Sequence, residues 1–231
     1  MTATPAPPTW LLEAEAALRA DLPSWFTDFA PPPDPQRRSA VLMLVSPGES
    51  GHDIVLTERS GHLRSHAGQV SFPGGKLDPG ETPVDAALRE TWEEVGADPA
   101  GIEIIGSFPD LWLSPSANAV TPVLGWSPEP GPLRVVDPGE VARVERIPVA
   151  DLVNPANRFM VKGPSGYVGP AFEVAGLFVW GFTAQLVSVL LDAADLTEPW
   201  DEGRRRRLPW RYVKPYLTQG VRRSTTRSAR R

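Results

Sequence analysis

Apolar and polar residues along the chain follow two spacings, and each spacing predicts a different kind of element. Short apolar or alternating runs bounded by turn residues are typical of strands, and they lie at 40–46, 53–59, 69–72, 102–108, 119–126 and 140–149, with a hairpin from 158–162 and 167–175. Apolar residues at helical spacing lie at 8–22, 82–96 and 179–192. Strands mixed with substantial helices predict an α/β domain in which helices cover a mixed sheet.

The apolar segment 174–191 has to be compared with a membrane span, because it holds 18 residues and no charge. That length lies at the lower limit for crossing a bilayer. Thr183, Gln185 and Ser188 interrupt the segment, and Pro170 lies shortly before it. We therefore predict a strand that runs into a buried helix, and no membrane span.

The segment 82–96 carries start and stop signals of a helix. Thr82 is followed by Pro83, with Asp85 three positions after the threonine, and this pattern predicts the first turn. Gly96 suits the left-handed residue that ends a helix. At about 100° per residue, one face is expected to hold Val84, Ala87, Leu88, Thr91, Trp92 and Val95.

The opposite side of this helix carries Glu90, Glu93 and Glu94, with Glu94 at the border of the apolar face and so partly buried. Like charges at this spacing destabilise an isolated helix. A multivalent cation would offset the repulsion, and Mg²⁺ or Mn²⁺ prefers such hard oxygen ligands. A solvated helix face would instead carry interspersed lysines, and there is no Lys from 77 to 161. We therefore expect a metal site.

The glycine and charged positions of this stretch are similar to the Nudix box, the signature of hydrolases that cleave nucleoside diphosphates linked to another moiety. The matching residues are Gly75, Glu81, Arg89, Glu90, Glu93, Glu94 and Gly96, and one position departs, since Thr91 stands where an aliphatic residue is usual. The resemblance implies a Nudix-type α/β/α sandwich with a mixed β-sheet. It also implies that Glu90 and Glu94 bind the metal, that Glu93 assists and that the Gly75 carbonyl joins them. Glu81 and Arg89 would hold the geometry of the loop and helix.

The segment before the box, 59–77, is a positive island in an otherwise acidic domain, because it holds Arg59, Arg64 and Lys76 but no acid. It suggests an anion-binding surface, or else a basic loop that balances the acidic helix. Its motif, "LTERSGHLRSHAGQVSFPGG", resembles the one found in the coenzyme A pyrophosphatase branch of Nudix hydrolases. That resemblance implies substrate binding by Arg59, Arg64, His66, Gly74 and Gly75.

Charge divides the chain unevenly, with a net −16 over residues 1–203 and +11 over residues 204–231. We expect an N-terminal helix and Pro-rich linker (1–37), a Nudix hydrolase domain (38–203) and a basic C-terminal tail (204–231). The tail could bind nucleic acid by charge alone, but a solvated tail is favoured. Trp210, Tyr212 and Tyr216 predict that 208–217 packs on the domain.

Together these features predict a Mg²⁺- or Mn²⁺-dependent hydrolase of a small-molecule substrate, coenzyme A or acyl-CoA, with 4′-phosphopantetheine (or its acyl form) and adenosine 3′,5′-bisphosphate as products. Two alternatives stay open: another dinucleotide such as ADP-ribose or NADH, and a non-catalytic regulator that binds nucleic acid. The candidates for general base are Glu90, Glu93, Asp110 and Glu173. The absence of cysteine and of a secretory signal suggests a cytoplasmic protein, and a homodimer stays open.

Overall fold

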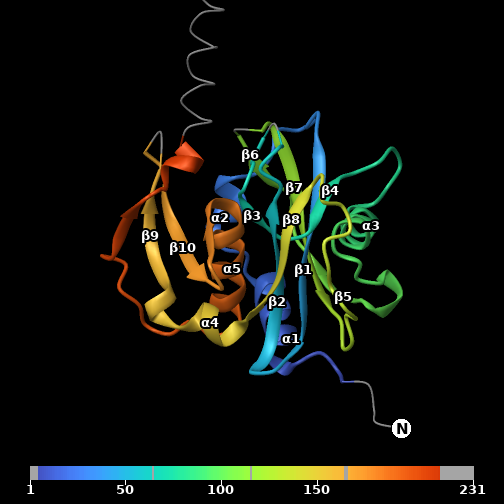
Figure 1. Ribbon diagram of the computed structural model, residues 1–231, viewed down its shortest axis with the longest axis horizontal. Helices are drawn as coiled ribbons and strands as arrows, with labels where there is room; N and C mark the ends of the chain where they lie inside the picture. The colour runs from blue at the N-terminus through green and yellow to red at the C-terminus, as the bar shows by residue number, and fades with distance from the viewer. Residues whose placement is uncertain (1–4, 64, 115, 164–165, 214–231) are drawn as a thin grey trace, which may run out of the picture.

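The computed structural model describes residues 5–63, 65–114, 116–163 and 166–213, and shows two sheets with helices between and beside them (Figure 1). The helices are α1 (Thr9–Ala20), α2 (Ser24–Asp28), α3 (Pro83–Val95), α4 (Val149–Val153) and α5 (Gly181–Ala193), with 3₁₀ turns at Pro99–Gly101 and Pro155–Asn157. The strands are β1 (Arg38–Gly48), β2 (Gly51–Arg59), β3 (Val70–Ser71), β4 (Gly74–Lys76), β5 (Glu103–Ser107), β6 (Leu111–Leu113), β7 (Asn118–Trp126), β8 (Val141–Pro148), β9 (Arg158–Lys162), β10 (Val168–Val174), β11 (Leu177–Trp180) and β12 (Arg205–Arg207).

The larger sheet is mixed, as the sequence predicts. Its strand order is β3-β2-β1-β7-β5, and β4, β6 and β8 pair with β1, β7 and β2 respectively. The pairing of β1 with β7 is parallel, whereas β1 pairs with β2 and with β4 in the antiparallel sense. The smaller sheet has the order β11-β10-β9-β12. The predicted hairpin 158–175 is its β9–β10 pair.

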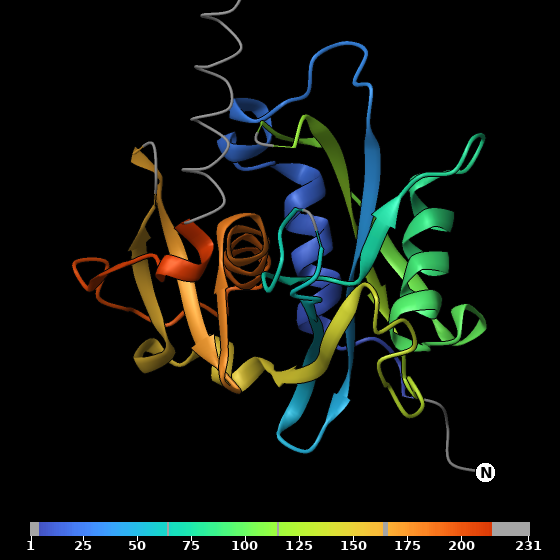
Figure 2. The ribbon, with the colours of Figure 1, turned by 45° about the horizontal axis from the view of Figure 1, so that its top comes forward.

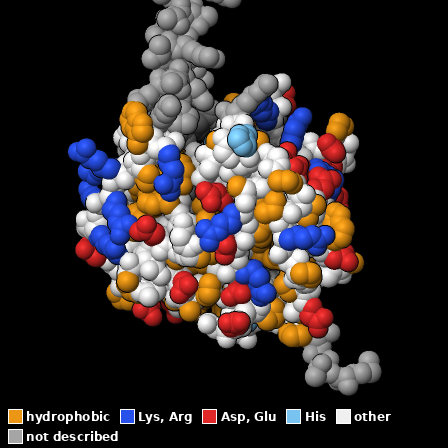
Figure 3. All heavy atoms as spheres, viewed as in Figure 1, with side chains coloured by type: hydrophobic (Ala, Val, Ile, Leu, Met, Phe, Trp, Pro, Cys, Tyr) orange, Lys and Arg blue, Asp and Glu red, His pale blue; other side chains and the backbone are white. Residues whose placement is uncertain are grey.

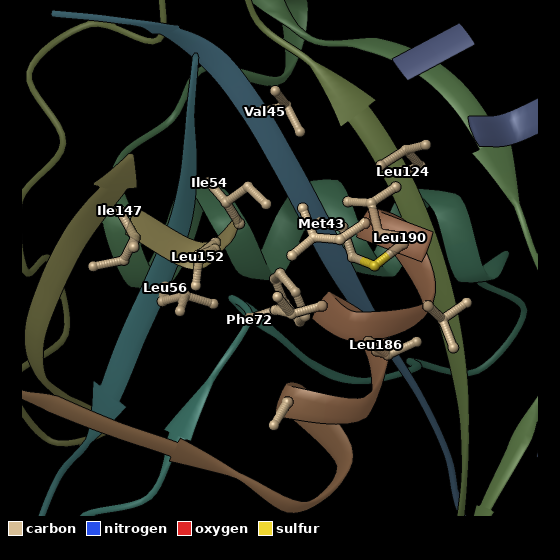
Figure 4. Packing of buried hydrophobic residues seen from close by; sticks show 14 of the residues in the cluster. Met43, Val45, Ile54, Leu56, Phe72, Leu124, Ile147, Leu152, Leu186 and Leu190 are labelled. Atoms are coloured by element: carbon tan, nitrogen blue, oxygen red, sulfur yellow. The ribbon is translucent and has the colours of Figure 1, made fainter. Parts of the chain in front are cut away.

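The larger sheet is buried on both faces. Successive residues of β1 point to opposite sides, so alternate residues pack against different helices. Leu42 and Leu44 pack with α3 residues on one side. Met43 and Val45 pack on the other side with α5 (Figure 4). The stick view places Met43, Val45, Ile54, Leu56, Phe72, Leu124, Ile147, Leu152, Leu186 and Leu190 in this cluster. The predicted layering of helices around a mixed sheet is therefore confirmed.

The segment 174–191 is a strand followed by a buried helix, as predicted, since β11 leads directly into α5. Most of α5 is buried, and it lies between the two sheets in Figure 1. Over the ranges that the structure describes, no helix has the length and apolarity needed to cross a membrane.

One detail of the predicted apolar face of α3 is wrong. Trp92 is 51% exposed, although it was assigned to the buried face. The buried residues are instead Ala86, Ala87, Thr91, Glu94 and Val95, so the buried stripe is rotated toward Ala86 and Glu94. Small side chains there let α3 approach β1 and β4 closely, and this geometry leaves Trp92 outside the contact.

The C-terminal segment joins the smaller sheet, where β12 pairs in parallel with β9. Basic side chains gather over this side of the molecule, at the left of Figure 3. Leu208 and Tyr212 are buried in the aromatic cluster of this sheet, whereas Trp210 is 65% exposed. Tyr216 lies outside the described residues. The domain boundaries at 37 and 203 stay predictions about independently folding units.

A pair of truncations tests the boundary at residue 203. Removing residues 214–231 should leave activity and melting temperature nearly unchanged. Removing everything after Glu202 should lower the melting temperature by roughly ten degrees, because two buried side chains at about 1.5–3 kcal/mol each are lost. Thermal unfolding followed by circular dichroism measures both. Equal melting temperatures for the two truncations would show that β12 and Tyr212 contribute nothing to stability.

Candidate active site on the glutamate helix

The site is organised by β4, which lies between β1 and α3 (Figure 2). Gly74 has a φ of 147°, and a Cβ there would overlap the backbone of Ala40 and Val41. At Gly75 an added Cβ would overlap the carboxylate of Glu90. Only glycine at position 74 therefore allows the chain to pass so close to β1, and a side chain at position 75 would displace the Glu90 carboxylate.

Helix α3 begins and ends as predicted. The Thr82 side chain accepts a hydrogen bond from the Asp85 N–H, and Gly96 is left-handed with a φ of 76°. These caps set where the helix begins and ends. Glu94 lies on the buried stripe and Glu90 beside it.

Glu94 is the most deeply buried acid of the site, at 3% exposure. The backbone N–H of Gly74 donates to its Oε2 at 3.1 Å. Among the described residues its Oε1 has no hydrogen-bond partner, and it forms an ion pair with Arg59 Nη1 at 4.0 Å. Burial raises the pKa of Glu94 to about 7, against the opposing effects of the Gly74 N–H and of Arg59.

Arg89 forms hydrogen bonds to the other acids of the site. Its guanidinium donates to Glu81 at 2.8 Å, to Glu90 at 3.0 Å, to Glu93 at 3.1 Å and to the carbonyl of Lys76 at 3.0 Å. The Glu90 side chain is 15% exposed and that of Glu93 is 54% exposed. Burial raises the pKa of Glu90, whereas hydrogen bonding from Arg89 lowers the pKa of Glu81. Glu81 and Arg89 thus connect the loop to the helix.

The carboxylates fit a hard divalent cation by their chemistry. Glu94 presents a buried oxygen without a hydrogen bond, and Glu90 is a second, largely buried carboxylate. A cation would favour the ionised form of both groups, which burial disfavours. In their present positions, the His, Asp and Glu side chains of the described ranges do not form a group of three able to hold a metal ion. Arginines neutralise these carboxylates instead.

Backbone hydrogen bonds hold part of the positive island (residues 59–77) beside this site. The backbone of Arg59 accepts from Gly68 N–H at 3.1 Å and donates to the Gln69 carbonyl at 2.9 Å, so it closes the loop between them. His66 has a φ of 57°, and its Nδ1 lies 3.0 Å from Gln69 Oε1. Among the predicted substrate residues, the structure places Arg59, Gly74 and Gly75 beside the glutamates and His66 in the loop. Arg64 lies outside the described residues.

The sequence reasoning missed Glu140. This exposed residue immediately precedes β8, and its carbonyl accepts from Ser60 N–H at 2.7 Å. Val141 pairs with Arg59 across the β2–β8 contact. The negative charge of Glu140 contributes to the raised pKa of both Glu90 and Glu94. No motif marks this residue, because only the pairing of β8 with β2 brings it to the site.

Asp110 and Glu173, the other acids considered as general bases, are engaged elsewhere, and Glu173 lies on a strand. Asp110 accepts from Arg38 at 2.8 Å and from Thr121 at 2.5 Å. Glu173 lies on β10 of the smaller sheet and accepts from Arg206 at 2.5 Å. Glu140, rather than either of these, is the acid coupled to the glutamates of the helix.

Comparison with known proteins identifies the family. The NUDIX domain model matches residues 36–164. The chain is 39% identical over 161 residues to an Escherichia coli protein named uncharacterized Nudix hydrolase NudL, a match that covers 67% of this chain and 81% of that protein. It is 37% identical over 144 residues to Nudix hydrolase 3 of Caenorhabditis elegans, which covers 61% of this chain but only 60% of that relative's length.

A solved structure supports the same fold. The Nudix hydrolase RenU of M. smegmatis superimposes with a TM-score of 0.51 at 18% identity, over 72% of this chain and 91% of that one. Members of the family generally use divalent metal ions. Since the family model covers more than half of the chain and a relative at 39% identity covers two thirds of it, this protein belongs to the Nudix hydrolase family.

Proposed function

We propose that this Nudix hydrolase cleaves the diphosphate bond of coenzyme A or acyl-CoA with Mg²⁺ or Mn²⁺. One observation carries the proposal. The segment that resembles the coenzyme A pyrophosphatase motif supplies Arg59, whose guanidinium lies 4.0 Å from the buried carboxylate of Glu94. The residues that would recognise the substrate and those that would hold the metal therefore share one site.

The proposal gives each residue of the candidate site a role. Glu90 and Glu94 would hold the cation, with Glu93 and the Gly75 carbonyl beside them. When bound, the cation supplies an activated water and neutralises charge on the phosphates. The positive island would bind the substrate's phosphates, because arginine forms planar, charge-assisted contacts with phosphate oxygens.

Glu140 is our candidate for the general base. Its carboxylate is exposed and has no hydrogen bond or ion pair within the described part of the chain, yet its charge influences both Glu90 and Glu94. An acid of this kind can accept a proton from water without giving up a structural contact. Glu93, in contrast, is already bound by Arg89.

The substrate is tested by a comparison of coenzyme A, 3′-dephospho-coenzyme A, ADP-ribose and NADH at fixed ionic strength, with products identified by mass spectrometry. We expect kcat/KM for coenzyme A to exceed that for the dephospho compound by roughly ten- to a hundredfold. That range is the value of one charge-assisted phosphate contact, about 1.5–3 kcal/mol. Should ADP-ribose or NADH be the best substrate, the coenzyme A assignment fails while the family chemistry stands.

The substitution Arg64→Ala tests which phosphate of the substrate the positive island (residues 59–77) binds. A narrowed preference for coenzyme A over the dephospho compound would assign Arg64 to the 3′-phosphate, and an equal loss for all four substrates would assign it to the diphosphate. Arg206→Ala is the matched control, since it removes the same charge from the smaller sheet, where Arg206 pairs with Glu173. Equal effects of the two variants would contradict a direct role for Arg64.

A further inference from the structure

The two arginines that neutralise the glutamates are held very differently. Arg89 makes hydrogen bonds to three acids and to the carbonyl of Lys76, so it is fixed in the frame of the site. The Arg59 guanidinium makes no hydrogen bond within the described ranges, and its contact with Glu94 is an ion pair at 4.0 Å. Its side chain is 24% exposed, compared with 3% for Glu94.

The main chain of Arg59 is nevertheless fixed. Its N–H and carbonyl are both bonded within the loop that closes at Gly68 and Gln69, and the residue lies at an irregularity in the β2–β8 register. The Cα position is therefore set, while the long side chain can turn without breaking a hydrogen bond. Rotating one partly exposed arginine side chain is a smaller and faster motion than moving the backbone.

The oxygen that faces Arg59 is also the one that a metal ion needs. Glu94 Oε1 has no hydrogen-bond donor in the part of the chain that the structure describes, whereas Oε2 accepts from the N–H of Gly74. Two cations cannot approach one buried carboxylate oxygen without repelling each other. A cation on Glu94 would therefore displace Arg59 from it.

We propose that Arg59 is an exchangeable counter-ion, which neutralises Glu94 in the metal-free protein and turns to the diphosphate of the substrate once a divalent cation is bound. The proposal rests on the proposed metal site but not on coenzyme A as the substrate. It makes the binding of cation and of diphosphate mutually favourable, because the same event that frees Arg59 from Glu94 offers it to phosphate.

The first test uses Mn²⁺ alone, with binding followed by electron paramagnetic resonance at pH 8.5. Arg59→Ala should bind Mn²⁺ at least about fivefold more tightly than the wild type, at the lower end of typical coupling between sites. Arg206→Ala, with the same change in net charge, should not. Unchanged or weaker Mn²⁺ binding by Arg59→Ala, with the circular dichroism spectrum preserved, would show that Arg59 does not compete for Glu94.

The second test asks where the released guanidinium goes. At saturating Mn²⁺, Arg59→Ala should raise KM at least about tenfold for the best substrate of the panel, whichever compound that is, as expected for a lost charge-assisted phosphate contact. An unchanged KM would overturn the transfer to substrate. If coenzyme A proved a poor substrate, the proposed function would fail, while the Mn²⁺ result would still decide the role of Arg59.

Discussion

Replacing Glu94 by glutamine is expected to lower kcat by about 10²–10³-fold at saturating Mg²⁺, while the metal-free protein becomes more stable at pH 8. The activity falls because glutamine keeps the shape of the side chain but loses the charge that a hard cation requires. The size of the loss is that of removing one charge-stabilising group from an active site. Near-normal turnover would remove Glu94 from the proposed metal site.

The gain in stability follows from the raised pKa of Glu94. This pKa is about 7 in the folded protein, compared with an ordinary value of 4.5, because the ionised carboxylate is buried. Its contribution to stability is fully present below pH 4.5 and is lost as the pH rises through 7. Above that range the ionised group destabilises the fold by at most about 3 kcal/mol. The neutral glutamine avoids this cost.

The measurement is thermal unfolding in the presence of a chelator at pH 8 and at pH 5. Glu94→Gln should raise the melting temperature by several degrees at pH 8, given about 2–4 °C per kcal/mol for a chain of this size. At pH 5 the gain should shrink, since Glu94 is then mostly protonated. The exposed Glu129 provides the matched control, and Glu129→Gln should change neither value. A lower melting temperature for Glu94→Gln at pH 8 would contradict the burial argument.

The same series separates the metal ligand from the candidate base. Glu140→Gln should reduce kcat while leaving Mn²⁺ affinity within about twofold, because an exposed acid that accepts a proton contributes little to cation binding. Glu94→Gln should reduce both quantities. If Glu140→Gln weakened Mn²⁺ binding as strongly as Glu94→Gln, Glu140 would be a metal ligand rather than the base.

The second large effect is expected from Gly74→Ala. A methyl group at this position would overlap the carbonyl oxygen of Ala40 and the Cα of Val41, and the φ of 147° is itself strained for alanine. Both obstacles are backbone, so no side-chain rotation relieves them. We expect a loss of roughly 3 kcal/mol or more in the free energy of unfolding, from the strain and the overlap together. Urea denaturation of the metal-free protein measures this loss.

Gly68→Ala is the matched control. Gly68 also has a positive φ, of 66°, but among the described residues, apart from its chain neighbours, no atom lies within 4 Å of the added Cβ. Its cost should be limited to about 1–2 kcal/mol of left-handed strain. Because the Gly74 N–H bonds to Glu94, Gly74→Ala should also reduce activity in the remaining folded protein. Equal destabilisation by the two substitutions would show that close approach to β1 is unimportant.

The sequence alone was sufficient for features that depend on residues close together in the chain. The capping pattern at Thr82 and the glycine at 96 determine where α3 begins and ends, and the structure has the same limits. The helix between these limits carries Glu90, Glu93 and Glu94. The four-residue step from Arg89 to Glu93 allows the hydrogen bond between those two side chains. Helical spacing and capping are local, so they survive without knowledge of the rest of the fold.

Only the tertiary structure decided how the helix is rotated and which distant groups join it. The hydrogen bond from Gly74 to Glu94 spans 20 positions and requires β4 to lie between β1 and α3. That contact buries Glu94 more deeply than its border position predicted, and it leaves Trp92 exposed although helical spacing placed Trp92 on the apolar face. Side-chain spacing specifies a stripe on a helix, but the surface packed against it determines which neighbouring stripe is buried.

The same reason explains why neither the position of Glu140 at the site nor strand β12 was predicted from the sequence. Glu140 reaches the site through the pairing of β8 with β2, and β12 joins β9 across more than forty residues of chain. Strand pairing at such separations depends on sheet order, which local alternation of apolar residues does not encode. The sequence of the helix therefore supplies the carboxylates of the proposed metal site, whereas their burial and the approach of Arg59 to Glu94 depend on the sheet.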